Sequence, residues 1–202
     1  MSGRLERSGQ ILAAAYNVFG DKGYYAAKMD DIANEAGVAK GTLYLYFANK
    51  EELFHAVIEK ILHDYLETYE YILDESIPFV DKLTSLVRHH LFFIRDRYDF
   101  ARMNVEEGPF NEKLRRKMAA IMERASNQFT RALQEAYPDA FDEEGAYLSY
   151  LCFSHMGDGM IGDMFWTKRR FPDEVLEERA QFVANLFVNG LSHMRTDREQ
   201  VL

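Results

Sequence analysis

The chain has few of the features that mark secreted or membrane-bound proteins. Its single cysteine, Cys152, permits no disulfide within the chain, which is typical of proteins from reducing compartments. The longest stretches without Asp, Glu, Lys or Arg, such as residues 145–157, are too short to span a bilayer. No apolar segment follows the charged first ten residues, as it would in a signal peptide. We therefore expect a cytoplasmic protein with no membrane partner.

The sequence also lacks alternating apolar and polar runs, internal repeats and low-complexity segments. Its apolar residues recur instead at helical spacing, as Leu12, Ala15 and Phe19 do at i, i+3 and i+7. Because 48% of the 202 residues are hydrophobic, the helices can bury a sizeable core. The predicted fold class is all-α, with two short helices between residues 28 and 47 and further helices at about 4–21, 49–73, 78–97, 99–107, 112–136, 142–168 and 173–194.

The two short helices lie in the segment KMDDIANEAGVAKGTLYLYF, residues 28–47. Ile32 and Ala36 share one face of the first helix, and Leu43 and Phe47 share one face of the second. Gly37 stands between them, where a residue that adopts positive φ at no steric cost can end a helix. Two short helices joined by such a turn form a helix-turn-helix, which places its second helix in the major groove of DNA.

The second helix has a composition suited to that use. Lysine and hydroxyl side chains contact phosphate, a glycine lets the backbone approach closely, and apolar or aromatic side chains contact base edges. These candidates are Lys40, Gly41, Thr42, Tyr44, Leu45 and Tyr46. The alternative is a surface helix pair with incidental tyrosines.

Charge is distributed unevenly along the chain. The formal net charge is −9, yet residues 1–50 hold six Lys or Arg against five Asp or Glu. The remaining residues hold 18 basic and 28 acidic side chains. The amino-terminal part alone therefore tolerates phosphate, and indiscriminate nucleic-acid binding is excluded.

The string DDIANEAGVAKGTLYLYFANKEELF resembles the signature of TetR-type transcriptional regulators. The match extends back through ILAAAYNVFGDKGYYAAKMDDIA and covers about the first 60 residues. The resemblance implies a helix-turn-helix DNA-binding domain at residues 1–48 and a helical ligand-binding and dimerisation domain at residues 49–202. It also implies a phosphate contact for Lys50. Lys28 and Ala39 stand where the family usually has Ser or Thr; Lys28 keeps an attraction for phosphate but loses the N-cap.

The same resemblance implies a homodimer held by the last two long helices. Small residues on one stripe of these helices let another helix approach closely, and Trp166 offers a large side chain for contact. The expected interface residues are Leu151, His155, Gly159, Trp166, Val183, Leu186, Phe187, Gly190 and Leu191. The alternative is that both stripes are buried within one subunit.

The resemblance further implies an effector pocket among the central helices. Methionine and aromatic residues would accept a small apolar or aromatic effector, and His90 would orient it. The candidates are His90, Phe93, Met103, Phe110, Met122, Phe129, Met156, Met160 and Phe165. The alternative is that they form ordinary core. We expect no cofactor, and a repressor that leaves a palindromic operator when the effector binds.

Three other functions compete with DNA binding: an enzyme, a metal-binding protein and a helical interaction module. Cys152, His155 and Asp158 contain the groups of a nucleophilic enzyme, but neighbours on one helix do not converge on one atom, and no oxyanion loop accompanies them. His89 and His90 are adjacent, so they diverge around a helix and make a poor metal site. A helical interaction module without DNA binding also remains open.

Overall fold

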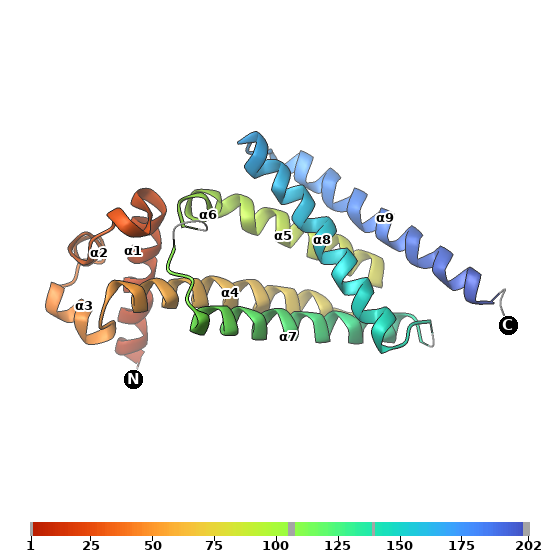
Figure 1. Ribbon diagram of the computed structural model, residues 1–202, viewed down its shortest axis with the longest axis horizontal. Coiled ribbons are helices and arrows are strands. Elements are labelled where there is room, and N and C mark those ends of the chain that lie inside the picture. Colours follow the sequence, from red (N-terminus) through yellow and green to blue (C-terminus); the bar gives the residue numbers. More distant parts are fainter. Residues whose placement is uncertain (1, 105–107, 139, 200–202) are drawn as a thin grey trace. The chain divides into compact units, whose positions relative to one another are not determined.

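A computed structural model of the protein describes residues 2–104, 108–138 and 140–199 (Figure 1). The described residues form nine helices and no strand, which confirms the all-α prediction. The helices are α1 (Ser2–Ala26), α2 (Met29–Glu35), α3 (Lys40–Tyr46), α4 (Lys50–Asp74), α5 (Phe79–Asp96), α6 (Tyr98–Asn104), α7 (Glu112–Ala136), α8 (Glu143–Thr167) and α9 (Asp173–Glu199). None of the helices in these ranges is long and apolar enough to cross a bilayer.

Most helix ends lie within three residues of their predicted positions. The first helix differs more, because it continues past its predicted end at residue 21 to Ala26. Gly23 interrupts it with φ of 74°, so the predicted break is present as a kink rather than an end. The last helix also runs five residues beyond its predicted end at 194.

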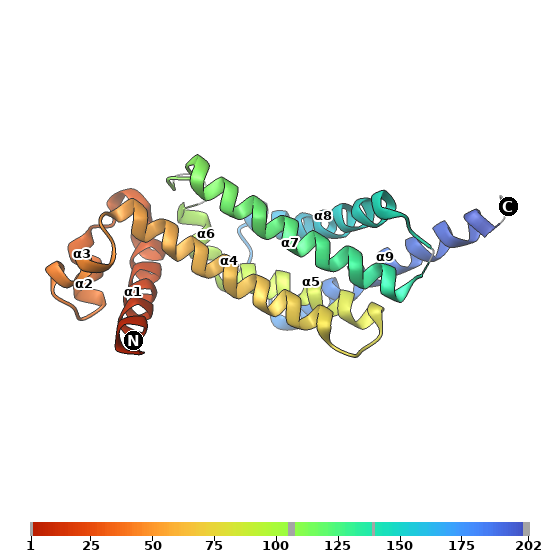
Figure 2. The same cartoon turned by 90° about the horizontal axis from the view of Figure 1, so that it is seen from below.

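The chain folds into two compact units. Unit 1 comprises residues 1–64 and 97–120, and unit 2 comprises residues 65–96 and 121–202. Both α4 and α7, each of which is drawn as one continuous helix in Figure 2, contribute residues to each unit. These units do not follow the division expected at residue 48. The boundary at residue 48 is the one that the family resemblance implies, and it stays a prediction.

Unit 1 has a core of its own around the first three helices. Phe19, Ile32 and Leu43, one residue from each of α1, α2 and α3, are fully buried. Helix α6 closes this core, since the ring of Phe100 stacks on Tyr16 at 4.9 Å. The sequence had not placed α6 with the DNA-binding helices. Its last residue, Asn104, is buried and donates from Nδ2 to the carbonyl oxygens of Phe19 and Phe100, each at 2.9 Å.

Unit 2 has a second core built around an aromatic cluster. The ring of Phe129 is fully buried and stacks on Phe153 at 5.2 Å, and Phe153 contacts Phe187 at 5.1 Å. These rings come from α7, α8 and α9. Helix α8 begins at a cap, where the Asp142 carboxylate accepts from the backbone N–H of Gly145 at 2.8 Å. It ends at Lys168, whose φ of 54° stops the helix.

Candidate functional site

Helices α2 and α3 form a helix-turn-helix on the core of unit 1 (Figure 1). Gly37 has φ of 62° and makes the turn between them, as its sequence position predicted. The turn is closed by a bond from the N–H of Val38 to the carbonyl oxygen of Ala33 at 3.0 Å. Leu43 anchors α3 with no exposed surface. The unit therefore holds α3 by one apolar face and leaves the other face open.

The open face of α3 carries the predicted DNA contacts. The exposed fraction of Leu45 is 78% and that of Tyr44 is 44%. A Cβ added at Gly41 would meet nothing within 4 Å, so the backbone is accessible there. Thr42 and Tyr46 are half-buried, and the Arg4 guanidinium lies 5.8 Å from the centre of the Tyr46 ring. The structure thus brings the predicted residues of α3 onto one short helix.

Lys40 is exposed but already has an anionic partner. Its Nζ lies 2.6 Å from Oδ1 of Asp30, the second residue of α2. The hydrogen bond with Asp30 raises the pKa of Lys40, so the ammonium keeps its charge. A phosphate at this position would compete with Asp30 for the same cation.

Neither short helix has a side-chain N-cap, as the residues at positions 28 and 39 predicted. The side chains of Lys28 and Ala39 make no capping hydrogen bond. The Asp31 carboxylate instead accepts from the backbone N–H of Lys28 at 3.3 Å and pairs with Lys22 at 2.9 Å. Its hydrogen bond with Lys22 lowers the pKa of Asp31. The Lys28 side chain is left exposed at the start of α2.

Lys50 has a structural role that the sequence did not reveal. Its Nζ donates to the carbonyl oxygens of Tyr24 at 2.8 Å, Tyr25 at 3.1 Å and Ala27 at 2.9 Å. Carbonyls at the end of a helix have no partner within it, and three bonds use every N–H of an ammonium group. Partial burial lowers the pKa of Lys50. Lys50 therefore ties the start of α4 to the connection between α1 and α2.

The predicted effector residues do not form one group. Phe129 is fully buried in the core of unit 2, and Met156 and Met160 pack against that core. Phe110 instead packs in unit 1, with its ring 6.1 Å from Phe54. The exposed fraction of Met122 is 59%. Phe93 and Phe165 are half-buried in α5 and α8, and the side chain of Met103 lies outside the described residues.

The predicted interface residues divide into two sets. Val183, Phe187 and Leu191 are buried within unit 2, and Leu151 is half-buried. The exposed set comprises His155, Gly159, Trp166, Leu186 and Gly190. The exposed fraction of Trp166 is 90% and that of Leu186 is 54%. Large apolar side chains are therefore open to solvent on both α8 and α9.

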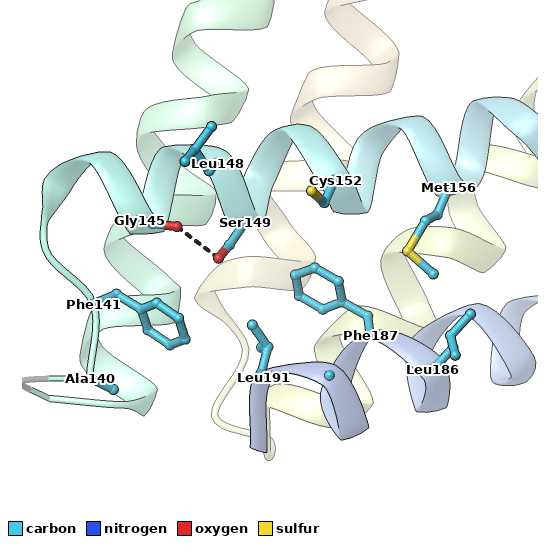
Figure 3. A pocket seen from close by; sticks show the side chains of 11 residues that line it. Ala140, Phe141, Gly145, Leu148, Ser149, Cys152, Met156, Leu186, Phe187 and Leu191 are labelled. Atoms are coloured by element: carbon cyan, nitrogen blue, oxygen red, sulfur yellow. Dashed lines mark hydrogen bonds between the residues drawn. The ribbon is translucent and has the colours of Figure 1, made fainter. Parts of the chain in front are cut away.

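An apolar hollow of about 450 Å³ lies between these two helices (Figure 3). Figure 3 shows Met156 of α8 and Phe187 and Leu191 of α9 pointing into the space between the helices. The hydroxyl of Ser149 is already used, because it donates to the carbonyl oxygen of Gly145 at 2.8 Å. The lining residues are Ala140, Phe141, Gly145, Leu148, Ser149, Cys152, Met156, Leu186, Phe187, Gly190 and Leu191.

The groups suggested for catalysis have separate partners. His155 bonds through Nδ1 to the carbonyl oxygen of Leu151 at 2.7 Å, and Asp158 bonds to His90 at 3.2 Å. Cys152 is exposed beside the hollow. Among the described residues, no three His, Cys, Asp or Glu side chains gather as a metal site requires.

Comparison with known proteins identifies the fold and its use. Residues 11–57, which contain the helix-turn-helix, match the model of the bacterial regulatory proteins of the tetR family. The helix-turn-helix segment is that of the TetR family of transcriptional regulators. It is 29% identical over 137 residues to the fatty acid metabolism regulator protein of Bacillus subtilis, across 67% of this chain and 71% of that protein. The proteins of this family and the Bacillus subtilis relative are transcriptional regulators, not enzymes.

Two further TetR-family relatives differ in how much they share. The transcriptional activator FasR of Mycolicibacterium smegmatis is 54% identical over 57 residues, which span 28% of this chain and 26% of FasR. FadR of Bacillus subtilis, solved in complex with stearoyl-CoA, superposes with a TM-score of 0.71 at 24% identity, covering 90% of this chain and 97% of that chain. The first likeness covers about a quarter of each protein, and the second concerns the fold as a whole.

Proposed function

We propose that this TetR-family regulator is a dimeric repressor that binds a near-palindromic operator and is released by an effector with a long apolar body. The observation that carries the proposal is the open face of α3, which a fully buried Leu43 fixes to unit 1. A short helix held in this way can enter the major groove with its exposed side chains toward base edges. Its place of action would be the cytoplasm, where the DNA is.

The DNA contacts follow from the exposure of each side chain. Tyr44 and Leu45 offer apolar and stacking contacts to base edges, and the open backbone at Gly41 allows close approach. The hydroxyls of Thr42 and Tyr46 would contact phosphate or sugar, as hydroxyls commonly do. These residues would set the sequence preference and the depth of α3 in the groove.

The three lysines would act differently. Lys28 would attract phosphate directly, because its side chain is exposed and makes no capping bond. Lys40 would exchange Asp30 for phosphate, which reduces its net contribution to affinity. Lys50 would contribute its charge while its hydrogen bonds hold the backbone before α2. Binding would therefore depend on fit and on two half-sites more than on charge.

Dimerisation would use the exposed apolar side chains of α8 and α9. Trp166, Phe182 and Leu186 are each more than half exposed, an arrangement that a second subunit would cover. Twofold pairing would present two α3 helices to half-sites about one DNA turn apart. The hollow between α8 and α9 would then lie at or beside the subunit interface.

The proposed effector class is a long-chain acyl-CoA. Support comes from the fatty acid regulator of Bacillus subtilis, which matches two thirds of this chain, and from the FadR complex with stearoyl-CoA. The apolar interior of unit 2 offers surroundings suited to an acyl chain. Effector binding would favour a dimer geometry that no longer matches successive grooves, with α4, which contributes to both units, as the connection. A coupling of ~1–3 kcal/mol would lower operator affinity roughly 5- to 150-fold.

The test has two stages. Purified protein is used to select DNA from a random pool, and the proposal expects a near-palindrome with half-sites about one turn apart. The selected DNA is then bound by the protein and titrated with palmitoyl-CoA while operator affinity is measured. Recovery of no common sequence would remove the DNA-reading part of the proposal. A tightly bound acyl-CoA that leaves operator affinity unchanged would remove the effector part.

The direction of regulation needs its own assay. The selected operator is placed over a promoter, and transcription is measured with and without protein. Repression that palmitoyl-CoA relieves is the expected result. Stimulation of transcription by the protein would instead make it an activator, as the name of FasR states for that relative.

A further inference from the structure

A chain of polar side chains in unit 2 leads from the half-buried Tyr65 to the exposed Asp158. The hydroxyl of Tyr65 in α4 lies 3.1 Å from Nδ1 of His90 in α5, and Nε2 of His90 lies 3.2 Å from Oδ1 of Asp158 in α8. An ionised carboxylate accepts the Nε2 proton, so in the neutral ring Nδ1 accepts from the Tyr65 hydroxyl. The hydrogen bond with His90 lowers the pKa of Asp158 and keeps it ionised. Tyr65 is therefore a satisfied donor.

The close approach of α8 to this chain depends on a missing side chain. A Cβ at Gly157 would lie 3.1 Å from Cδ2 of His90. This spacing is tighter than ordinary contact, so the glycine gives the imidazole room against α8. Asp158, the next residue, then reaches the far nitrogen of the same ring.

Tyr69, one turn after Tyr65 on α4, differs from Tyr65 in the hydrogen bonding of its hydroxyl. Its exposed fraction is 5%, and its hydroxyl has no hydrogen-bond partner among the residues that the structure describes. The ring lies 6.1 Å from that of Tyr65. Burial raises its pKa, and the neighbouring phenols of Tyr65 and Tyr150 raise it further, so Tyr69 stays a neutral donor. A buried donor without an acceptor is costly, and native proteins rarely leave one.

We propose that the Tyr69 hydroxyl is the hydrogen-bond anchor for an uncharged carbonyl oxygen on the effector, such as that of an acyl thioester. This inference rests on the proposed effector function and deepens it. The anchor discriminates against a free fatty acid for two reasons. A carboxylate would lose its hydration in this interior. It would also meet the field of Asp158, which adds to the larger effect of burial in raising the pKa of Tyr65 and Tyr150.

The Tyr65–His90–Asp158 chain determines which of the two tyrosine hydroxyls is available to a ligand. Because Tyr65 donates to His90, its hydroxyl hydrogen is not available to the ligand, and Tyr69 is left as the unused donor beside it. The effector is therefore oriented by one neutral hydrogen bond within otherwise apolar surroundings. The acyl chain supplies most of the affinity, and the anchor supplies the preference for an ester-type carbonyl.

The test compares two probes that differ in one oxygen atom. Palmitoyl-CoA carries the thioester carbonyl, and S-hexadecyl-CoA is the matching thioether without it. Calorimetric titration of the full-length protein should show the thioester binding about 2- to 10-fold more tightly, the range of one neutral hydrogen bond. Tyr69→Phe should abolish that difference by weakening the thioester alone. Tyr71→Phe on the exposed side of the same helix serves as the control and should keep the difference.

A second measurement guards against misfolding and hidden partners. In ligand-free protein, Tyr69→Phe should leave the melting temperature unchanged or raised, because the hydroxyl it removes has no partner. A clear fall in melting temperature would show that the protein itself satisfies Tyr69, which would overturn the anchor. Equal binding of both probes to the wild type, or a difference that persists in Tyr69→Phe, would also overturn it. If neither probe binds, the acyl-CoA effector fails together with its anchor.

Discussion

The two units of this regulator use their polar side chains in opposite ways. In unit 1 the functional helix α3 turns its polar and aromatic groups outward, and its one buried contact is the apolar Leu43. In unit 2 the polar chain leads from the exposed Asp158 through His90 to the half-buried Tyr65, next to the buried hydroxyl of Tyr69. Recognition of a large charged polymer needs groups already in water. Recognition of a small apolar ligand benefits from a polar group that water does not reach.

This difference explains why the sequence predicted the helix-turn-helix but not the polar chain of unit 2. The helix-turn-helix is local: Gly37, the apolar positions around it and the α3 side chains lie within 20 residues. Helix starts are equally local, because Asn49 and Asn111 cap α4 and α7 through their side-chain oxygens at 2.8 Å and 3.0 Å. Helical periodicity therefore predicted nearly the whole helix order.

Contacts between distant segments were not predictable in the same way. Tyr65, His90 and Asp158 are separated by 25 and 68 residues, and no pattern in the sequence links them. The three carbonyl acceptors of Lys50 lie 23 to 26 residues before it. Phe110 and Phe129 were both predicted to line the effector pocket, yet they belong to different units. Methionine and aromatic content cannot distinguish a core from a pocket.

The largest effect should come from removing the buried side chain that holds α3 on the core of unit 1. Leu43→Ala removes a fully buried side chain, so it should lower the free energy of unfolding by about 2–5 kcal/mol and abolish operator binding. Leu45→Ala on the exposed face of the same helix should change unfolding by no more than about 0.5 kcal/mol while still weakening operator binding. Denaturant unfolding and DNA binding of both variants are the measurements. Similar stabilities for the two variants would contradict the division of α3 into a buried and an open face.

A charge on the exposed stripe of α9 should separate the subunits. Leu186→Glu would place an unpaired carboxylate in the proposed interface, at a cost of about 2 kcal/mol or more, so the dimer dissociation constant should rise roughly 30-fold or more. Sedimentation across a concentration series measures this. Tyr71→Glu, at an equally exposed position on α4, is the matched control and should leave association unchanged. An unaltered dimer in Leu186→Glu would place the interface elsewhere.

Lys50 and Lys28 should differ in what their loss affects. Lys50→Met removes three bonds to backbone carbonyls, so the free energy of unfolding should fall by about 1–3 kcal/mol. Lys28→Met should leave stability unchanged and reduce the slope of log affinity against log salt by about 1, as the loss of one phosphate contact does. Thermal unfolding and DNA titrations at several salt concentrations check both. Unchanged stability in Lys50→Met would contradict its role in holding the connection between α1 and α2.

The smallest effect should be a pH-dependent one in unit 2. The Asp158 pKa is lowered below its ordinary value of 3.8 by the His90 hydrogen bond, so its stabilising contribution is present above that value and is lost as pH falls through the lower folded pKa. Because the Asp158 side chain is 59% exposed, the contribution should stay below about 1 kcal/mol. Melting curves of the wild type and Asp158→Asn should differ at neutral pH and converge in acid. A constant difference across the series would remove the link to Asp158 ionisation.

The most direct test concerns the claim that the open face of α3 reads base sequence. Affinity for the selected operator and for a scrambled duplex of equal length is measured for the wild type and for the Tyr44→Ala, Leu45→Ala double variant. The account predicts that the ratio of the two affinities collapses, since each base pair that is no longer recognised costs about 1–3 kcal/mol of preference. Affinity for the scrambled duplex and its salt dependence should stay the same. A double variant that keeps the full preference for the operator would contradict it.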